Sequence, residues 1–375
     1  MTSLSSFAKK PRLTLLQATL SVLVCALALS LSANASSIVK FNAPGAGTSS
    51  GQGTVPLAIN TSGVVVGYYI DSNSAFHGFG RLTNGTIAGF NAPGAGTGAG
   101  EGTYGYSINK TNVVAGFYID GSGTYHGYVR AVNGTFSTFA VAGASGTLNA
   151  NINDSGVSAG YSFDASGVYH GFVRAANGTV TSFNAPGAGT SSGTGTLTGG
   201  VDCINNSGVV VGNYIDNNGV LHGYARDAGG NFTTFDAPGA GTGSGEGTEV
   251  SGINDSGVII GIVIDSNGVF HGFVRAANGT FSAINAPGAG NGSGQGTEPE
   301  NINASGAIIG QYLDANGVNH GFQRAPSGGI VTGNVPGAGN SAGQGTIPDS
   351  NSSTNKIDGE YIDAAGVAHG FLFTP

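Results

Sequence analysis

The sequence contains no tryptophan, two cysteines, one methionine and few charged residues. Cys25 lies in the apolar N-terminal segment, so Cys203 is the only thiol of the rest of the chain and no disulfide can form there. Charged residues make up 9% of the chain, and 20 acidic residues outnumber 12 basic ones. This composition argues against nucleic acid and anionic membranes as partners. A fold without disulfides must be held by its core and its topology.

The N-terminus predicts an export signal. Three basic residues within residues 9–12 precede an apolar run from Leu13 to Leu31, and Ala33-Asn34-Ala35 supplies the small residues that a signal peptidase reads. We expect a signal peptide over residues 1–35 with cleavage after Ala35. The mature chain would be secreted, extracellular or periplasmic. It would have nine basic and twenty acidic side chains, a net charge of −11.

Two alternatives for this segment remain open. A retained membrane anchor is one, although the apolar run is near the lower length for a span. A lipid on Cys25 is the other, although Val24 is bulky for the usual attachment motif. With cleavage after Ala35, the mature chain has no membrane span.

Glycine is abundant, at 70 of 375 residues against a usual ~7%. It recurs at fixed intervals between runs of Val, Ile, Phe and Tyr, which predicts tight turns rather than disorder. The histidines show the period most clearly. Each is followed by Gly and an aromatic residue, and preceded at six residues by an aspartate. The pairs are Asp71 with His77, Asp120 with His126, Asp164 with His170, Asp216 with His222, Asp265 with His271, Asp314 with His320 and Asp363 with His369.

This spacing, 49 residues in most repeats, predicts one four-stranded propeller blade per repeat. Three connections are short turns and one is long. In a propeller the long connection returns the chain from the outermost strand to the next innermost strand. We therefore assign the Ile-Asn strand as innermost, then the Val-Val-Gly-Tyr strand, the His-Gly-Phe strand, and the Thr-Phe-x-x-Phe strand as outermost.

The chain ends complement each other. Residues 37–44 match a fourth strand, whereas the chain ends at Pro375, just after a third strand. The N-terminal strand should therefore complete the C-terminal blade and remove the exposed edge. The sequence predicts an all-β fold, a seven-bladed β-propeller over residues 36–375. An open solenoid is the runner-up.

The combined pattern resembles the HAF-repeat family of bacterial extracellular proteins. The resemblance rests on Ile-Asn-x-x-Gly-x-x-x-Gly-x-Tyr, His-Gly-Phe and Phe-x-x-Phe-Asn-Ala-Pro-Gly-Ala, and covers nearly all of the mature chain. The family's usual His-Ala-Phe is His-Gly-Phe or His-Gly-Tyr here. The third repeat lacks Pro at Ala140-Val-Ala-Gly-Ala and has a shorter loop, and the seventh has Asn351-Ser-Ser where Ile-Asn is expected. The resemblance implies export and a repeated β fold, and no defined activity.

The Asp/His pairs are interpreted as structural. An aspartate that orients a histidine is half of a catalytic triad, but seven copies on seven blades cannot converge on one substrate. We expect each aspartate and histidine to flank one hairpin as buried polar groups that bond to each other or to the backbone. No Cys or His cluster has metal-ligand spacing. Asp-x-Asn-Gly turns lack the other ligands of a calcium loop and are read as hairpin turns. We therefore expect no catalytic residue, no metal and no cofactor.

The long loops are the best candidates for a binding surface. Gln or Glu recurs between glycines at one loop position, with tyrosines nearby in the second repeat. The candidate residues are Gln52, Glu101, Tyr104, Tyr106, Glu246, Gln295 and Gln344.

Two functions are carried forward. The first is a secreted, monomeric, non-enzymatic module that binds a glycan, a peptide or a cell-surface partner, or acts as a scaffold. The second is a propeller enzyme of the lyase or hydrolase type at the mouth of the central channel. The enzyme would need unlike, blade-specific polar residues around that channel.

Overall fold

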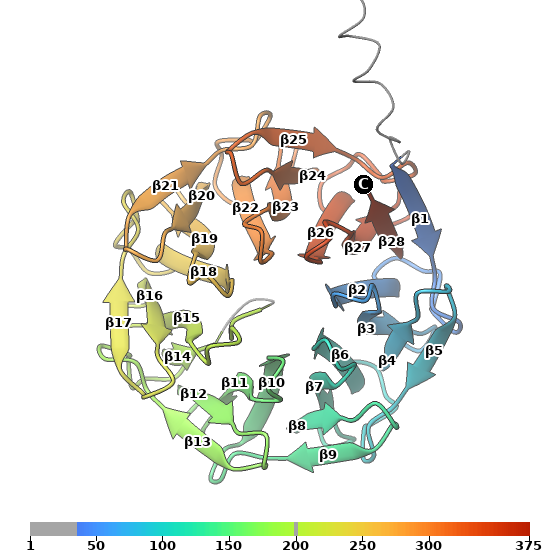
Figure 1. Cartoon of the computed structure of the whole chain (residues 1–375), viewed down its shortest axis with the longest axis horizontal. Helices are drawn as coiled ribbons and strands as arrows, with labels where there is room; N and C mark the ends of the chain where they lie inside the picture. Colours follow the sequence, from blue (N-terminus) through green and yellow to red (C-terminus); the bar gives the residue numbers. More distant parts are fainter. Residues whose placement is uncertain (1–35, 199–201) are drawn as a thin grey trace, which may run out of the picture. The chain divides into compact units, whose positions relative to one another are not determined.

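A computed structural model describes residues 36–198 and 202–375. The predicted signal peptide lies outside these residues. The regular structure consists of β-strands throughout, arranged in concentric layers of a ring formed by residues 37–374 (Figure 1). In the described part of the chain no helix is long and apolar enough to cross a membrane.

The strands fall into four layers. The innermost are β2 (Gly53–Ile59), β6 (Gly102–Ile108), β10 (Gly146–Ile152), β14 (Gly195–Leu197), β18 (Gly247–Ile253), β22 (Gly296–Ile302) and β26 (Gly345–Asn351). The second are β3 (Val65–Ile70), β7 (Val114–Ile119), β11 (Ser158–Phe163), β15 (Val210–Ile215), β19 (Ile259–Ile264), β23 (Ile308–Leu313) and β27 (Ile357–Ile362). The third are β4 (Phe76–Arg81), β8 (Tyr125–Arg130), β12 (Tyr169–Arg174), β16 (Leu221–Arg226), β20 (Phe270–Arg275), β24 (Asn319–Arg324) and β28 (Ala368–Thr374). The outermost are β5 (Ile87–Phe90), β9 (Phe136–Phe139), β13 (Val180–Phe183), β17 (Phe232–Phe235), β21 (Phe281–Ile284), β25 (Ile330–Gly333) and β1 (Ser37–Phe41).

Each innermost strand pairs antiparallel with its second strand, the second with the third, and the third with the outermost, as in β2–β3–β4–β5. We call such a set a blade and name it by its innermost strand. The strand order is the one predicted from the loop lengths. The innermost strands other than the short β14 share a register shift that skips one residue near the middle, as between Pro56 and Ala58 in β2. This β-bulge bends the strand locally and re-aims the skipped side chain.

The turns follow from the sequence. In the Asp-x-Asn-Gly hairpin at Asp265, one carboxylate oxygen accepts the N–H groups of Asn267 and Val269, at 2.8 and 2.9 Å. Gly268 takes the positive φ, 72°, that closes the turn. The long loops are fastened by a threonine at the second position of each innermost strand. Thr54 Oγ1, for example, accepts the N–H of Ala43 at 2.9 Å, and Thr54 is fully buried.

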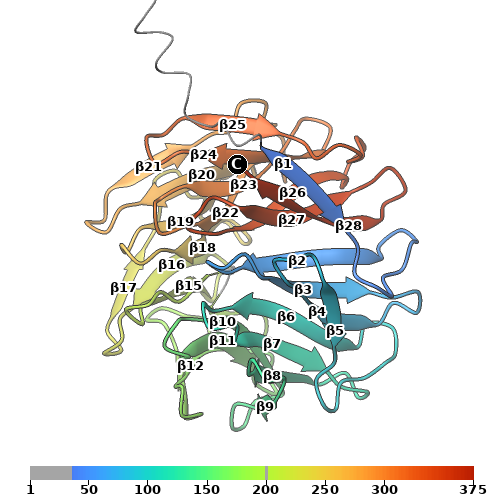
Figure 2. The same cartoon turned by 45° about the vertical axis from the view of Figure 1, so that its right-hand side comes forward.

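The two chain ends meet in one blade. β1 pairs antiparallel with β28 over five residues, from Ser37↔Thr374 to Phe41↔Gly370 (Figures 1 and 2). The Phe41 ring lies 6.2 Å from that of Phe79 in the next blade. The N-terminal strand therefore completes the blade that the C-terminal strands begin.

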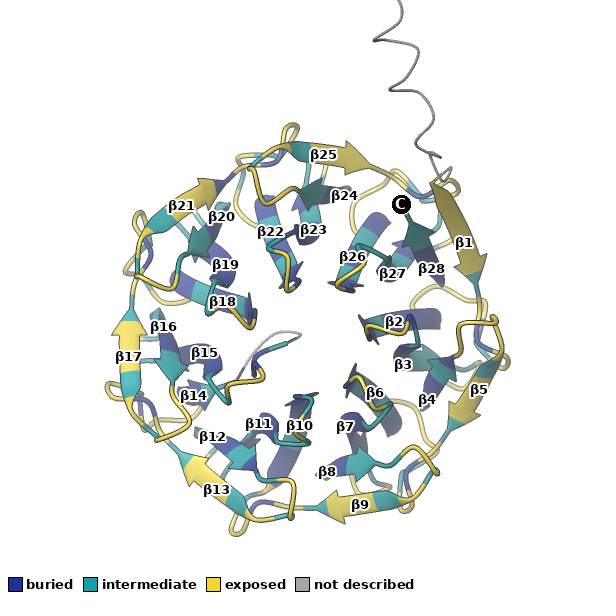
Figure 3. Cartoon of the chain, in the orientation of Figure 1, coloured by how far each residue is buried: buried dark blue, intermediate teal, exposed yellow. Residues whose placement is uncertain are grey.

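The core lies between blades. Figure 3 shows buried residues on the inner three layers and exposed ones on the outermost strands. One such layer joins Ala58 and Val66 of the β2 blade to Ile108 and Val114 of the β6 blade. Further out, an arginine of one blade lies over a phenylalanine of the preceding blade. These pairs are Arg81 with Phe41, Arg130 with Phe90, Arg174 with Phe139, Arg226 with Phe183 and Arg275 with Phe235, at 4.7–5.1 Å.

Candidate functional site

The mouth of the central channel is built on a ring of buried asparagines that follow the innermost strands. Each Nδ2 donates to the backbone carbonyl of the equivalent residue in the next blade, at 2.9–3.2 Å. Each Oδ1 accepts two N–H groups of its own turn, as Asn254 does from Ser256 and Val258. The donors are Asn60, Asn109, Asn153, Asn205, Asn254 and Asn303, with Ser352 in the last place. The ring fixes the mouth and is structural.

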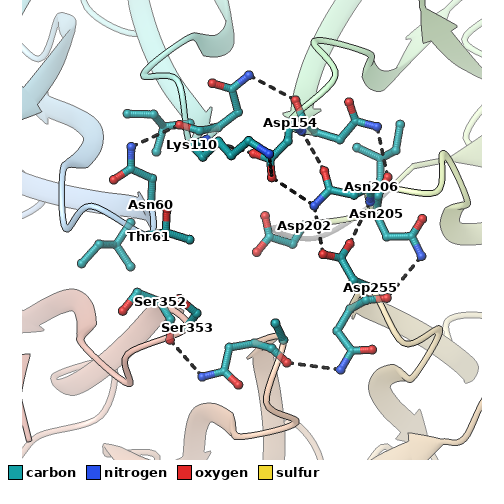
Figure 4. A pocket seen from close by; sticks show the side chains of 18 of the residues that line it. Asn60, Thr61, Lys110, Asp154, Asp202, Asn205, Asn206, Asp255, Ser352 and Ser353 are labelled. Atoms are coloured by element: carbon teal, nitrogen blue, oxygen red, sulfur yellow. Dashed lines mark hydrogen bonds and ion pairs between the residues drawn. The ribbon is translucent and has the colours of Figure 1, made fainter.

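The residue after each ring position differs from blade to blade. These residues are Thr61, Lys110, Asp154, Asn206, Asp255, Ala304 and Ser353, and they border a cavity of about 160 Å³ (Figure 4). On one side they form a continuous polar arc. Lys110 Nζ lies 3.3 Å from Asp154 Oδ2, and Asn206 Nδ2 donates to Asp154 and Asp255 at 3.1 and 2.9 Å. The opposite side carries only small side chains, so the mouth is not seven-fold symmetric.

Asp202 adds a carboxyl group inside this mouth. It follows the insertion of the fourth repeat, and Figure 4 shows it within the circle of labelled side chains. Its Oδ2 accepts a hydrogen bond from Asn301 Nδ2 at 2.8 Å. Burial raises the pKa of Asp202, and the nearby Asp255 and Asp154 carboxylates raise it further. The neighbouring Cys203 is fully buried against Val210 and Val211, and its pKa is raised by burial. This places the thiol in the core rather than in the mouth.

Deeper in the channel, five acidic residues come from three consecutive blades. We call them the channel carboxylates: Glu249, Glu298, Glu300, Asp349 and Glu360. Glu300 and Asp349 are the residues skipped at the bulges of β22 and β26. Both interact electrostatically with Tyr106 of the β6 blade, which is not a neighbour of the β22 blade. Glu300, Asp349 and Tyr106 therefore face a common central space.

The channel carboxylates hold protons more strongly than ordinary acids. Burial raises the pKa of Glu300 to about 8, with the carboxylates of Glu298 and Glu249 adding to the shift. Burial also raises the pKa of Glu360 to about 8, and that of Asp349 well above its usual range. Gln311 Nε2 donates to Glu298 at 3.2 Å. Glu300 and Glu360 are thus largely protonated at pH 7 and can donate protons. In the described part of the chain no three acidic, His or Cys residues are placed to hold a metal ion.

The opposite side of the ring is aromatic. Tyr104 stacks between Phe76 and Phe117, with ring centroids 4.5 Å away on each side. Tyr125 continues this row, at 5.9 Å from Phe117 and 5.9 Å from Phe163. The row runs across three consecutive blades, from the β2 blade to the β10 blade. It presents ring faces and phenolic edges rather than charges.

This row ends in a hollow of about 380 Å³, which we call the aromatic cleft. Half-buried Tyr125, Leu148, Tyr161, Phe163 and Tyr169 border it, with Gly167, Ser192 and Gly193 at the rim. The cleft lies where the third repeat has its short loop. Elsewhere a glycine N–H of the long loop donates to a carbonyl of the preceding hairpin, as Gly193 does to Gly167. The end of the long loop also forms a parallel β-bridge to the third strand, as in Tyr169↔Gly195. Among the described residues the short loop forms no bridge to Tyr125, and the cleft stays open.

The predicted loop residues are not gathered in one site. Gln52, Glu101, Glu246, Gln295 and Gln344 each accept an N–H of their own loop, at 2.7–3.2 Å. Gln52, Gln295 and Gln344 also donate to the carbonyl of a neighbouring hairpin. The structure distributes them around the ring, one per blade, as loop fasteners. Tyr104 and Tyr106 instead lie on β6, in the aromatic row and the channel.

The histidines contact the aspartates of their own hairpins. An Asp Oδ2 lies 2.8–3.4 Å from the Nε2 of His77, His126, His170, His271, His320 and His369. The exception is His222, whose Nε2 lies 3.9 Å from Asp216 Oδ2 and whose Nδ1 lies 2.8 Å from Asp236 Oδ1. The Nδ1 atoms of His77, His170, His320 and His369 reach the asparagine that follows the outermost strand, at 2.8–3.2 Å. The pairs thus tie the outer strands of a blade together.

The expectation that these pairs are buried is wrong. The imidazoles of His77, His126, His170, His222, His320 and His369 are 19–30% exposed, and that of His271 is 45% exposed. The reason is that each histidine lies at the start of the third strand, beside the exposed hairpin, whereas the glycine and aromatic residue after it are buried. Tyrosine rings cover one imidazole face of His77, His126, His222, His320 and His369. The residues opposite His170 and His271 are Ser162 and Val263 instead.

The sequence motifs did not predict the channel carboxylates, the polar arc or the aromatic cleft. The signal was present in the comparison of the repeats. Glu300 and Asp349 stand where other repeats have Leu57, Ala150 or Ser251, and the third repeat is five residues shorter than most. At these positions the amino acid or the loop length differs between repeats, whereas the motifs consist of positions that the repeats share.

Comparison with known proteins adds the fold. No protein-family model and no curated protein sequence matches the chain. A streptogramin B lyase structure matches at 13% identity with a TM-score of 0.55, over 90% of this chain and 97% of the other. The chain is a β-propeller.

Two other propellers match more weakly. They are a lectin from Burkholderia pseudomallei (11% identity, TM-score 0.47, 72% of this chain and 80% of the other) and TolB from Acinetobacter baumannii (12%, 0.46, 84% and 64%). At these identities the likeness concerns the fold alone, because one propeller scaffold hosts unrelated activities.

Proposed function

We propose that this protein is an exported, seven-bladed β-propeller of the HAF-repeat type that binds a carbohydrate without chemically changing it. The blade count follows from seven copies of the Asp/His motif and from four paired strands around each copy. Export follows from the N-terminal segment read in the sequence. The binding role is supported by one observation above the others, the aromatic cleft.

The cleft has the chemistry of a sugar site. A pyranose ring has a flat face of C–H groups and an edge of hydroxyl groups. Tyr125, Tyr161 and Tyr169 offer apolar ring faces for the former and phenolic oxygens for the latter. Their half-buried positions fix the rings before a ligand arrives, which limits the entropy lost on binding. Ser192 adds a hydroxyl group at the rim.

The position of the cleft suggests that it was opened by a deletion. The third repeat keeps the strands and the hairpin of the other repeats but lacks five loop residues. The lost loop segment is the one that covers the equivalent surface elsewhere, through bonds such as Gly100 N–H to Ser74 O. The same deletion would have removed the glutamine or glutamate that accepts a loop N–H in other repeats. A structural scaffold gains nothing from losing this contact, whereas a binding site gains access.

A glycan array with residues 36–375 tests the proposal. The unmodified chain should retain a defined class of glycan, and Tyr125→Ala should weaken that binding at least about tenfold. Phe270→Ala is the matched control, because Phe270 occupies the same register position in the β18 blade as Tyr125 in the β6 blade. That variant should bind as the unmodified chain does.

A loop exchange tests whether binding requires the open cleft and not only its aromatic side chains. Replacing residues 140–146 by residues 91–102 of the preceding connection restores the long loop and leaves the aromatic residues of the cleft unchanged. Binding should be lost although the chain stays folded. Binding that survives this exchange, or selective capture of peptides in place of glycans, would contradict the assignment.

A second candidate function is supported by the channel carboxylates. An enzyme needs an acid that is protonated near neutral pH, and Glu300 and Glu360 have pKa values raised to about 8. If the channel catalyses hydrolysis or elimination, activity should depend on a group that titrates near pH 8, and Glu300→Gln should abolish it. A screen of glycosides and esters that finds no turnover above the Glu300→Gln background leaves carbohydrate binding as the function.

A further inference from the structure

The β22 blade lacks a side chain that every other blade places opposite a glycine of its third strand. In the third strand of each blade a glycine faces the last residue of the outermost strand. That residue is Phe in five blades, Ile284 in the β18 blade and Gly333 in the β22 blade. The glycine is needed because the ring lies directly on the backbone. A Cβ at Gly78 would come within 2.3 Å of the Phe90 ring.

The missing ring leaves a hollow between the β22 and β26 blades, which we call the outer pocket. It measures about 190 Å³, and its border includes Gly321, Gly333, Val335, Ile357, Phe371 and Phe373. Its border is mainly apolar. Val335, Ile357 and Phe371 are at most 7% exposed, so the pocket reaches the core between these blades. A Cβ built at Gly333 meets no atom within 4 Å.

The partner residue has changed as well. In five blades an arginine lies over the phenylalanine of the preceding blade, as Arg130 lies over Phe90 at 4.8 Å. The β26 blade has Phe373 at the arginine position, and the preceding blade has Gly333. An arginine here would have no ring to cover. Phe373 instead gives the pocket an aromatic wall and no charge, which suits an uncharged ring.

We propose that the outer pocket binds a small monocyclic aromatic molecule, whose ring takes the place that phenylalanine fills in five other blades. This environment accepts a benzene-sized ring, because in each of those five blades a phenylalanine ring lies against the glycine equivalent to Gly321. Apolar cavities of about this size, lined by aliphatic and aromatic side chains, bind benzene-sized molecules in proteins. The pocket is independent of the aromatic cleft and of the proposed carbohydrate binding.

The test uses ethylbenzene as probe and residues 36–375 as protein. Binding is followed by chemical-shift changes of the methyl groups of Val335 and Ile357. The unmodified chain should bind ethylbenzene with a dissociation constant of roughly 0.1–1 mM. Gly333→Phe should fill the pocket, raise the melting temperature and weaken binding at least about tenfold. Glycerol, a polar control of similar size, should cause no shift.

A second variant guards against an uninformative result. Phe90→Gly removes the ring of the β2 blade and should create a second site of the same kind, provided that the variant remains folded. The proposal is overturned if buffer saturated with ethylbenzene leaves the Val335 and Ile357 signals unchanged. It is also overturned if Gly333→Phe folds and binds ethylbenzene as strongly as the unmodified chain.

Discussion

At the scale of single residues, the asparagine ring shows why one side chain recurs at the end of the innermost strand. An amide offers a carbonyl oxygen with two lone pairs and an N–H₂ group on one short stem. Asn254 uses the oxygen for its own turn and the nitrogen for the carbonyl of Asn303. Aspartate could close the turn but could not donate, and the hydroxyl of Ser352 bonds within its own turn, to Lys356 N–H and Thr354. The ring thus couples each turn to the next blade.

Removing one ring amide should therefore be costly. Asn254→Ala removes the acceptor of the Ser256 and Val258 N–H groups and one donor to the Asn303 carbonyl oxygen, and each lost hydrogen bond costs about 0.5–1.5 kcal/mol. We expect a loss of roughly 2–4 kcal/mol in the free energy of unfolding. Asn278→Ala is the control, because the exposed Asn278 makes the same kind of turn bond to Thr280. Denaturant titration should show a change below about 1 kcal/mol for the control. Equal effects would contradict a special role for the ring.

The channel carboxylates give the stability of the protein a pH dependence. Glu300 and Glu360 have an ordinary pKa of 4.5 and a folded-state pKa of about 8. Between these values the folded state binds more protons than the unfolded state, so stability falls as pH rises from 4.5 to 8. Glu300→Gln cannot ionise and should flatten this decline, with a gain on the order of 1–3 kcal/mol at pH 8.

Thermal unfolding measured from pH 5 to 9 checks this expectation. The aspartates of the hairpins provide the opposite trend at lower pH. Hydrogen bonds from Ser122, His126 and the backbone hold the pKa of Asp120 below its usual range, so its stabilising effect is lost in acid. A Glu300→Gln variant whose pH profile coincides with that of the unmodified chain would show that this carboxyl ionises freely in the folded state.

At the scale of elements, the repeated features were predictable because seven copies report on the same environment. The loop lengths indicated the strand order, and Asp-x5-His indicated a contact across each hairpin. The features that could not be predicted lie at positions where one repeat differs from the others. The bulge in β22 that directs Glu300 toward the channel depends on pairing with β23, and no local motif marks it. The short loop at Ala140 was visible, but its consequence depends on the surface that the long loops cover in other blades.

The loop residues show the reverse error. Glutamine and glutamate between glycines resemble an exposed polar surface in the sequence, but Gln52 is 9% exposed and bonded to its own loop. A flexible loop with many glycines needs internal hydrogen bonds to take one shape, because ordering each residue costs about 1–2 kcal/mol. Recurrence in most repeats was thus a sign of a structural requirement.

At the scale of the whole molecule, the ring is closed by five residue pairs between β1 and β28. The closing strand brings Phe41 into the core between blades, where it packs with Ile59, Val65 and Phe79. It also brings Asn42 to His369 and places Phe41 under Arg81. Contacts that join strands and blades elsewhere in the ring are therefore repeated here between the two ends of the chain. Closure removes the exposed edge of β28, which would otherwise pair with another chain.

Deleting the closing strand tests this arrangement. A chain that starts at Ala43 loses the β1 pairing and the burial of Phe41, which is worth about 1.5–3 kcal/mol by itself. We expect a lower melting temperature than for residues 36–375, and dimers or larger species in size-exclusion chromatography, because the edge of β28 is free. A synthetic peptide of residues 36–42 should restore the monomer by adding the missing strand, and a scrambled peptide should not. A truncated chain that stays monomeric and melts at the original temperature would mean that β1 contributes nothing to closure.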